Sequence, residues 1–178
     1  MQKIIFTGPE STGKSLLSAF LADTMNTRWV PEYARFYLSR IKRPYTEGDI
    51  LHIARGQQQW EGVWAREARG FLFCDTSLLV PKIWSSYKYG RVDPWIVDTL
   101  QARMGDFYFL CNADLPWAYD PLREHPHLRE ALYDLYLDSL EQMGADYVVL
   151  SGSLEERKQT ALLHLQEKFP HLWGELIF

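Results

Sequence analysis

The sequence lacks the features that mark several specialised classes of protein. Its 178 residues include two cysteines, Cys74 and Cys111, each at the end of a short apolar run, so buried thiols are expected and a disulfide framework is excluded. No apolar run approaches the ~18 residues of a membrane span, and the first residues lead straight into a strand instead of a signal peptide. These absences predict a cytoplasmic chain with no membrane partner.

Basic charge is also scarce. Lys and Arg number 19 against 23 Asp and Glu, which gives a net charge of −4, so no nucleic-acid partner is expected. The densest basic group is interpreted as a charged helix end facing water, and it consists of Arg35, Arg40, Lys42 and Arg43. Repeats, low-complexity tracts and Gly/Ser linkers are absent, so one domain is predicted over residues 1–178. The oligomeric state is left open.

What the sequence does contain is an alternation of short apolar runs with longer helical patterns. The runs are continuous instead of alternating with polar residues, which indicates strands that are covered on both faces. The fold class is therefore α/β, a three-layer sandwich around a parallel sheet of about five strands. Strands are predicted at 3–7, 28–30, 70–75, 106–111 and 146–150, and helices at about 14–25, 33–41, 46–68, 78–87, 94–104, 127–143 and 153–168.

Residues 8–15, GPESTGKS, match the phosphate-loop pattern G-x-x-x-x-G-K-[ST] directly after a predicted strand and before a predicted helix. Gly8 and Gly13 permit the backbone angles of a loop whose N–H groups turn inward. Lys14 is expected to reach the β- and γ-phosphates of ATP, and the Ser15 hydroxyl to bind Mg²⁺. The predicted nucleotide-binding residues are Gly8, Glu10, Ser11, Thr12, Gly13, Lys14, Ser15 and Leu16.

Two acidic residues follow predicted strands whose carboxyl ends should meet at this loop. Asp75 is predicted to complete the Mg²⁺ site and to contact substrate, or alternatively to cap the helix that follows. Glu32 is predicted to hold or deprotonate a substrate hydroxyl, with Arg35 beside it in the substrate site. The alternative for Glu32 is a structural ion pair with Arg35 along one helical turn.

The class of phosphate-loop protein is narrowed by what surrounds the loop. GTP-binding switch proteins recognise guanine through an N-K-x-D motif, which is missing here, since its nearest counterpart is Asn112-Ala113-Asp114. Hexameric motors and helicases require longer chains. A small kinase fits better. The long irregular stretch 112–126 is predicted to lead into a lid around 112–129. In that lid Arg123 is predicted to contact the transferring phosphoryl group and Arg129 to add a second contact; the alternative for Arg123 is an ion pair with Asp120 or Glu124.

Four segments carry a resemblance to a known family: GPESTGKS, WVPEYAR (29–35), FLFCDTSLL (71–79) and YDPLRE (119–124). The whole chain resembles the ribosylnicotinamide kinase domain of the bifunctional bacterial NAD-biosynthesis regulators, which are P-loop kinases of an AAA-like NTPase family. The resemblance implies ATP-dependent phosphorylation of nicotinamide riboside to the mononucleotide. Two departures stand out: Pro31 lies where those proteins have Trp, and no H-x-G-H motif occurs, so no adenylyltransferase or DNA-binding activity is carried over.

A positively charged nicotinamide ring favours an aromatic wall. Aromatic residues near the expected crevice are Trp29, Tyr33, Trp60, Trp84 and Tyr87, and ordinary packing is the alternative for each. The predicted function is thus a small-molecule kinase acting on a nucleoside, with nicotinamide riboside as its substrate. Two alternatives stay open, namely a kinase of another nucleoside or small metabolite, and an ATP-binding regulatory module without kinase activity.

Overall fold

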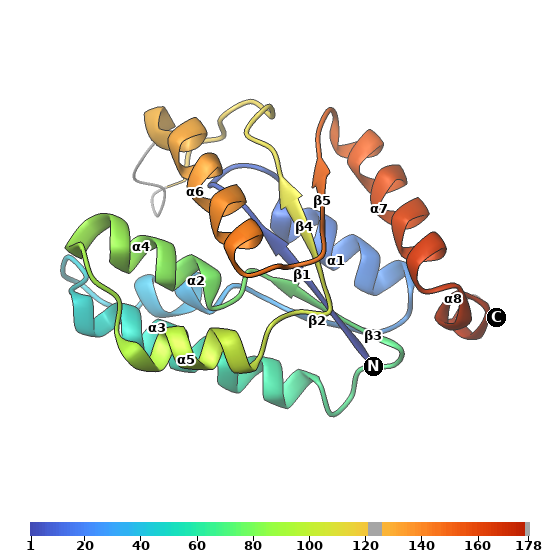
Figure 1. The fold of residues 1–178 in the computed structure, drawn as a ribbon, viewed down its shortest axis with the longest axis horizontal. Coiled ribbons are helices and arrows are strands. Elements are labelled where there is room, and N and C mark those ends of the chain that lie inside the picture. The colour runs from blue at the N-terminus through green and yellow to red at the C-terminus, as the bar shows by residue number, and fades with distance from the viewer. Residues whose placement is uncertain (121–125, 177–178) are drawn as a thin grey trace.

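The computed structural model describes residues 1–120 and 126–176, and its centre is a parallel sheet of five strands (Figure 1). The strands lie in the order β2-β3-β1-β4-β5, so β1 pairs with β3 on one side and with β4 on the other. Their bounds are β1 Gln2–Thr7, β2 Arg28–Val30, β3 Phe71–Asp75, β4 Phe107–Cys111 and β5 Tyr147–Leu150. This arrangement brings the carboxyl ends of β1, β2 and β3 to the same edge.

Helices cover both faces of the sheet and make it the middle of three layers (Figure 1). One face is covered by α1 Lys14–Thr24, α7 Leu154–Lys168 and α8 Pro170–Leu176. The other face is covered by α3 Glu47–Trp64, α4 Leu79–Tyr89, α5 Pro94–Ala102 and α6 Arg129–Gln142. The short helix α2, Tyr33–Leu38, joins β2 to α3, and a 3₁₀ turn at Pro126–Leu128 precedes α6.

Continuous apolar runs form the central strands because both of their faces are buried. Along β1, Ile4 and Phe6 enter the core under α1 and α7, whereas Ile5 enters the core under α3 to α6. Successive side chains of a strand point to opposite faces, so a strand covered on both faces needs apolar residues at every position. Full burial of each such side chain contributes roughly 1.5–3 kcal/mol, which makes this sheet a rigid base for the loops at its edge.

The sequence-based fold class is confirmed, and all five strands and seven helices expected from the pattern are present within a few residues. The helix expected to reach residue 68 ends at Trp64, and the pattern that begins at residue 127 opens with the 3₁₀ turn before α6. Helix α8 was not expected; its Trp173 packs against the core under α1. Both cysteines are buried free thiols.

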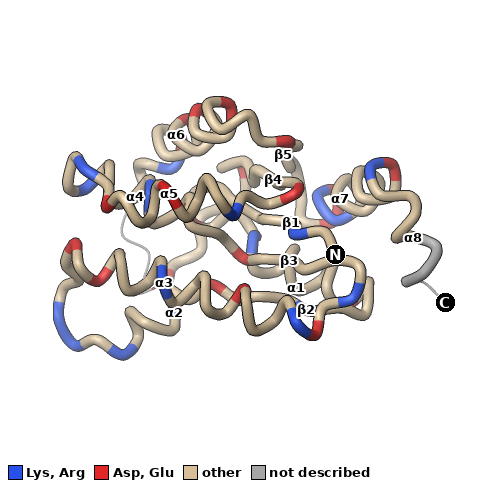
Figure 2. Tube along the Cα trace, turned by 60° about the horizontal axis from the view of Figure 1, so that its bottom comes forward, with Lys and Arg blue, Asp and Glu red and all other residues tan. Residues whose placement is uncertain are grey.

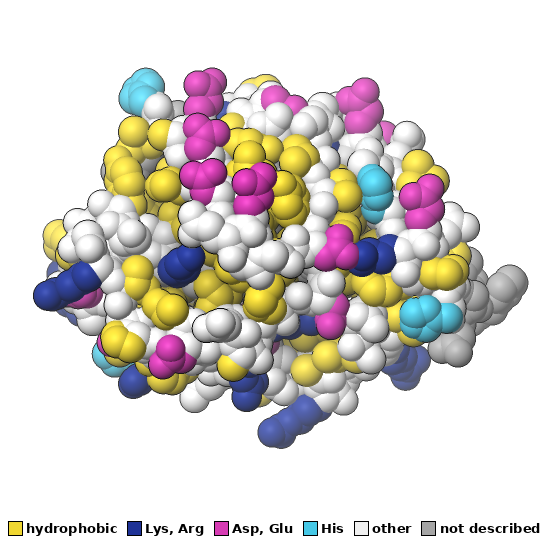
Figure 3. Space-filling view, viewed as in Figure 1, with side chains coloured by type: hydrophobic (Ala, Val, Ile, Leu, Met, Phe, Trp, Pro, Cys, Tyr) yellow, Lys and Arg dark blue, Asp and Glu magenta, His cyan; other side chains and the backbone are white. Residues whose placement is uncertain are grey.

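Charged residues lie mainly on the outside of the helical layers. The connection between α2 and α3 carries blue segments in Figure 2. Its Arg40, Lys42 and Arg43 are exposed, as expected for a solvated helix end. Arg35 of the same group is instead half-buried. The outer surface of α6 carries a row of acidic side chains (Figure 3), formed by Glu130, Asp134, Asp138 and Glu141. Among the described residues, no helix combines the length and the apolar character that crossing a membrane would require.

Candidate functional site

A cleft of about 390 Å³ opens at the edge of the sheet where β1, β2 and β3 end. The loop between β1 and α1 forms one end of it, and an apolar pocket between α3, α4 and α6 forms the other. Glu32, which follows β2, lies between these two ends. The cleft therefore joins the loop at residues 8–15 to an apolar pocket, and its volume suits a small organic molecule.

The loop at residues 8–15 has the backbone that its sequence pattern predicts. Gly8 has φ 123°, and a Cβ added there would lie 2.6 Å from the main-chain oxygen of Cys111 in β4. Gly13 has φ 83°, and a Cβ there would lie 2.8 Å from a methyl group of Leu154. Both glycines are thus required by conformation and by close approach. Lys14 Nζ donates to the main-chain oxygen of Pro9 at 2.5 Å, so its ammonium group already lies over the loop.

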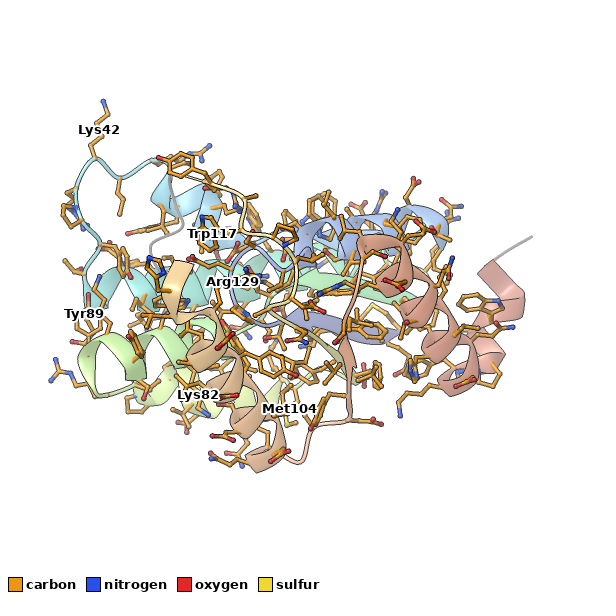
Figure 4. All side chains as sticks on the ribbon, turned by 90° about the horizontal axis from the view of Figure 1, so that it is seen from above. Lys42, Lys82, Tyr89, Met104, Trp117 and Arg129 are labelled. Atoms are coloured by element: carbon orange, nitrogen blue, oxygen red, sulfur yellow. The ribbon has the colours of Figure 1, made fainter. Side chains whose placement is uncertain are left out.

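The outer side of the loop is held by the segment that follows β4. The main-chain N–H of Ala118 donates to the Ser11 hydroxyl at 2.9 Å, and Arg129 donates to the Ser11 main-chain oxygen at 3.2 Å. Arg129 also lies over the ring of Trp117, with 5.9 Å from its guanidinium carbon to the ring centroid (Figure 4). Arg129, the last residue of the predicted lid region, therefore contacts the main chain of the phosphate loop. Arg123, the predicted transition-state arginine, lies outside the described residues.

Two carboxyl groups lie near Lys14: Glu32 lines the cleft, and Asp75 is buried at the end of β3. Burial, together with the negative charge of Asp75, raises the pKa of Glu32 to about 7 against the opposing positive charges of Lys14 and Arg35. Burial also raises the pKa of Asp75, which is opposed by Lys14 and by a hydrogen bond from the Ser15 hydroxyl. Two neighbouring carboxyl groups whose pKa values are raised by burial mark a site where an added positive charge is favourable.

Asp75 and Ser15 fit the requirements of a magnesium ion. The side chain of Asp75 is almost fully buried, and its Oδ1 atom has no hydrogen-bond partner among the residues that the structure describes. Mg²⁺ is commonly held by one or two protein oxygens together with phosphate oxygens and water, so a carboxylate next to a hydroxyl suffices. Asp75 does not cap the following helix, because α4 begins at Leu79 and Leu78 occupies the N-cap position.

Arg35 joins Glu32 to the segment after β4. Its guanidinium group lies 2.5 Å from a carboxylate oxygen of Asp120 and 3.6 Å from one of Glu32. The ion pair that was considered as the alternative role for Glu32 is therefore present. It does not exclude the other role, since Glu32 also lines the cleft and keeps a raised pKa.

Of the five aromatic candidates, Trp84 lines the cleft. Tyr33 and Trp60 pack edge to face at 4.9 Å between ring centroids, and Trp29 packs in the core on the opposite face of the sheet. Tyr87 is largely exposed. Ordinary packing or exposure thus explains these four positions.

Two aromatic residues that the sequence did not single out also line the cleft. Tyr136 comes from the inner face of α6, where its spacing indicated only core packing. Tyr45 comes from the irregular segment before α3 and is covered by the ammonium group of Lys88, 3.5 Å from its ring centroid. No periodic signal distinguishes either residue from ordinary core or loop aromatics.

Replacing Asp75 by Asn is expected to raise the concentration of Mg²⁺ needed for half-maximal activity and to lower the maximal rate. The amide keeps the shape of the side chain but removes the charge that the orphaned oxygen offers to a cation. Titration of activity with Mg²⁺ measures both effects. The same substitution at Asp106, which accepts from the main-chain N–H of Lys3 at the other end of the sheet, is the control. An unchanged Mg²⁺ requirement in the Asp75 variant would remove this residue from the ion's site.

Comparison with known proteins supports this picture. A family model described as an AAA domain matches residues 3–157. The trifunctional NAD biosynthesis/regulator protein NadR of Escherichia coli strain K12 is 26% identical over 183 residues, which cover 98% of this chain and 43% of NadR. The chain thus spans less than half the length of that relative.

Two solved structures show the same fold. A NadR protein in complex with NR superposes with a TM-score of 0.80 at 20% identity, over 93% of this chain and 49% of that chain. Thymidylate kinase from Ehrlichia chaffeensis superposes with a TM-score of 0.66 at 14% identity, over 93% of this chain and 98% of that chain. At such identities the likeness shows the fold, which is that of the P-loop nucleotide kinases.

Proposed function

This chain belongs to the AAA domain family, and from that premise we propose that it is an ATP-dependent kinase that phosphorylates nicotinamide riboside to nicotinamide mononucleotide. One observation carries the proposal. A single cleft runs from the phosphate loop, past the half-buried carboxyl group of Glu32, to an apolar pocket with aromatic walls, and the buried carboxyl group of Asp75 lies close to Glu32 and Lys14. A kinase for a small nucleoside needs these three parts in this order.

At the phosphate end, Lys14 neutralises the β- and γ-phosphates, and the inward N–H groups of residues 8–15 bind the remaining oxygens. Asp75 and Ser15 would hold Mg²⁺, and the bound ion would neutralise charge on the phosphate oxygens. Ser11 and Thr76 line the cleft with positive φ angles of 58° and 75°, which are uncommon for residues other than glycine. We interpret both as loop positions held in place to serve the site.

At the centre of the cleft, Glu32 orients the 5′-hydroxyl of the nucleoside and accepts its proton. The raised pKa of about 7 suits a carboxylate that must take up a proton near neutral pH. Arg35 fixes the position of Glu32 through their ion pair and ties it to Asp120. Phosphoryl transfer depends mainly on positioning and charge, so this alignment matters as much as the proton transfer itself.

In the apolar pocket, Tyr45, Trp84 and Tyr136 offer aromatic surface to the base. A pyridinium ring carries a positive charge, and its contact with an aromatic face contributes on the order of 1–2 kcal/mol in a desolvated site. The NadR relative and the NadR structure in complex with NR, on the same fold, support nicotinamide riboside as the nucleoside. The match covers 43% of the trifunctional relative, and the proposal concerns this one activity.

The test is to incubate the protein with ATP, Mg²⁺ and a panel of nucleosides that includes nicotinamide riboside, and to identify products by mass. A mass gain of one phosphate on nicotinamide riboside is the expected result. Phosphorylation of a different nucleoside alone would keep the kinase and reject the substrate. Binding of ATP without any phosphorylated product would instead favour a regulatory module.

A further inference from the structure

Arg157, in the first turns of α7, is a fully buried arginine on a helix whose neighbouring residues are mainly charged and exposed. The sequence pattern gave no signal for it, since it follows two glutamates and precedes a lysine. Burying a guanidinium group is costly unless all its charge and donors are satisfied. The contacts of Arg157 therefore show which parts of the structure its burial serves.

The Arg157 guanidinium joins three loops. It donates to the main-chain oxygen of Thr12 in the phosphate loop at 3.1 Å, to that of Asn112 after β4 at 3.3 Å, and to that of Gly152 after β5 at 2.9 Å. It also forms an ion pair with the Asp114 carboxylate. The second oxygen of that carboxylate accepts from the Gly152 N–H at 2.7 Å, so the two outer loops are linked to each other as well.

The bond to Thr12 bears directly on how the phosphate loop presents its donors. In a planar trans peptide, the carbonyl of one residue and the N–H of the next point in opposite directions. Because Arg157 holds the Thr12 carbonyl from behind, the N–H of Gly13 is turned the other way, toward the cleft. A single side chain therefore sets the orientation of one of the groups that bind phosphate.

The same loops supply the apolar walls at this end of the cleft. Leu115 and Leu154 line the cleft and lie 3.3 and 2.8 Å from the position of a Cβ on Gly13. They follow Asp114 and Gly152, whose positions Arg157 fixes. Within the described part of the chain, the hydrogen bonds and the ion pair of Arg157 go to the three loops and not to Glu32 or to the aromatic residues of the pocket.

We propose that Arg157 is a positioning residue for the nucleotide: acting through Thr12, Asp114 and Gly152, it shapes the phosphate loop and the leucine walls for ATP and leaves the nucleoside pocket unaffected. The inference rests on the proposed function only in that residues 8–15 bind a nucleotide. Its role is separate from transfer itself, because Arg157 lies behind the loop and touches no reacting group.

The test is Arg157→Lys, which keeps the charge but removes the forked donor that reaches three loops. Binding of MgADP, measured by calorimetry, is expected to weaken by about tenfold or more, since bonds from a charged donor are lost. The KM for ATP should rise in the same way, while the KM for the nucleoside stays within about twofold of the parent. Asp114→Asn, which leaves Arg157 in place without its charged partner, should weaken MgADP binding in the same direction and serves if the lysine variant does not fold.

The matched control is Arg43→Lys. Arg43 also makes a forked contact with a carboxylate, 2.6 and 2.9 Å from the oxygens of Asp49, but it lies away from the phosphate loop. Both lysine variants should lower the melting temperature, and only Arg157→Lys should weaken MgADP binding. Equal MgADP affinity in the parent, Arg157→Lys and Asp114→Asn would overturn this inference and leave Arg157 a purely structural clamp. A parent protein that binds no MgADP would overturn the proposed function as well.

Discussion

At pH 8, replacement of Glu32 by Gln is expected to raise the melting temperature while lowering kcat by roughly 10²-fold or more. The rate falls because the amide cannot accept the proton of the substrate hydroxyl. The stability rises because the carboxyl group is held in a place that disfavours its charge. Burial and the neighbouring Asp75 raise its pKa from 4.5 to about 7. A single substitution therefore separates the two roles considered for this residue.

The sign of the pH effect follows from the direction of the pKa shift. The folded protein binds the Glu32 proton more tightly than the unfolded chain, so this group stabilises the fold fully below pH 4.5 and loses that contribution as pH rises through about 7. Glutamine is neutral throughout, so the variant should gain on the order of 1–2 kcal/mol over the parent at pH 8 and much less at pH 5. Thermal unfolding of both proteins at the two pH values measures the difference.

Asp49→Asn provides the opposite case for comparison. Asp49 is more deeply buried than Glu32, but hydrogen bonds from Arg43 and Tyr37 lower its pKa far below the usual range, so its charge stabilises the fold above the unfolded pKa. That variant should melt at a lower temperature than the parent at pH 8. If Glu32→Gln likewise melts lower at both pH values, the ion pair with Arg35 is the main role of Glu32, and the assignment as a base loses its physical support.

Lys14→Ala is expected to abolish measurable turnover, a loss of at least about 10³-fold, with the fold intact. The shape of the loop comes from Gly8 and Gly13, whose positions allow no Cβ, whereas Lys14 gives the loop one hydrogen bond to Pro9. Turnover and the circular dichroism spectrum of the variant together measure both parts of the expectation.

Lys82→Ala, on α4, is the control for the loss of a lysine outside the phosphate loop. It should turn over like the parent. Turnover by Lys14→Ala at the parental rate, with a normal spectrum, would reject phosphate binding by residues 8–15 as the basis of the activity.

The sequence predicted most of the fold and the phosphate half of the site because these follow from local pattern. Continuous apolar runs require strands buried on both faces, and the spacing of Gly8, Gly13 and Lys14 is itself the structure of the loop. Asp75 and Glu32 were placed near each other because parallel strands end at a common edge. The structure brings both close to Lys14, with Glu32 lining the cleft and Asp75 buried at the end of β3.

The pocket half of the site depends on contacts between distant segments, which local pattern does not contain. Trp29 was a candidate for the substrate wall, but it precedes Val30 in β2, and alternation along the strand sends the two side chains to opposite faces. Tyr136 has helical spacing shared with ordinary core residues, and Tyr45 lies in an irregular segment. Arg157 is apparent only once three loops are seen to meet at its guanidinium group.

The order of the strands has a consequence for how this protein folds. The central strand β1 ends at Thr7, yet its two partners begin at Phe71 and Phe107, so no neighbour of β1 is near it in sequence. Pairing between such distant segments requires the closure of long loops, and the entropy lost in closing them precedes the free energy gained from the contacts. Chains of this kind therefore fold slowly. The phosphate loop, whose Gly8 packs on Cys111 of β4, therefore acquires its shape only when most of the chain has folded around it.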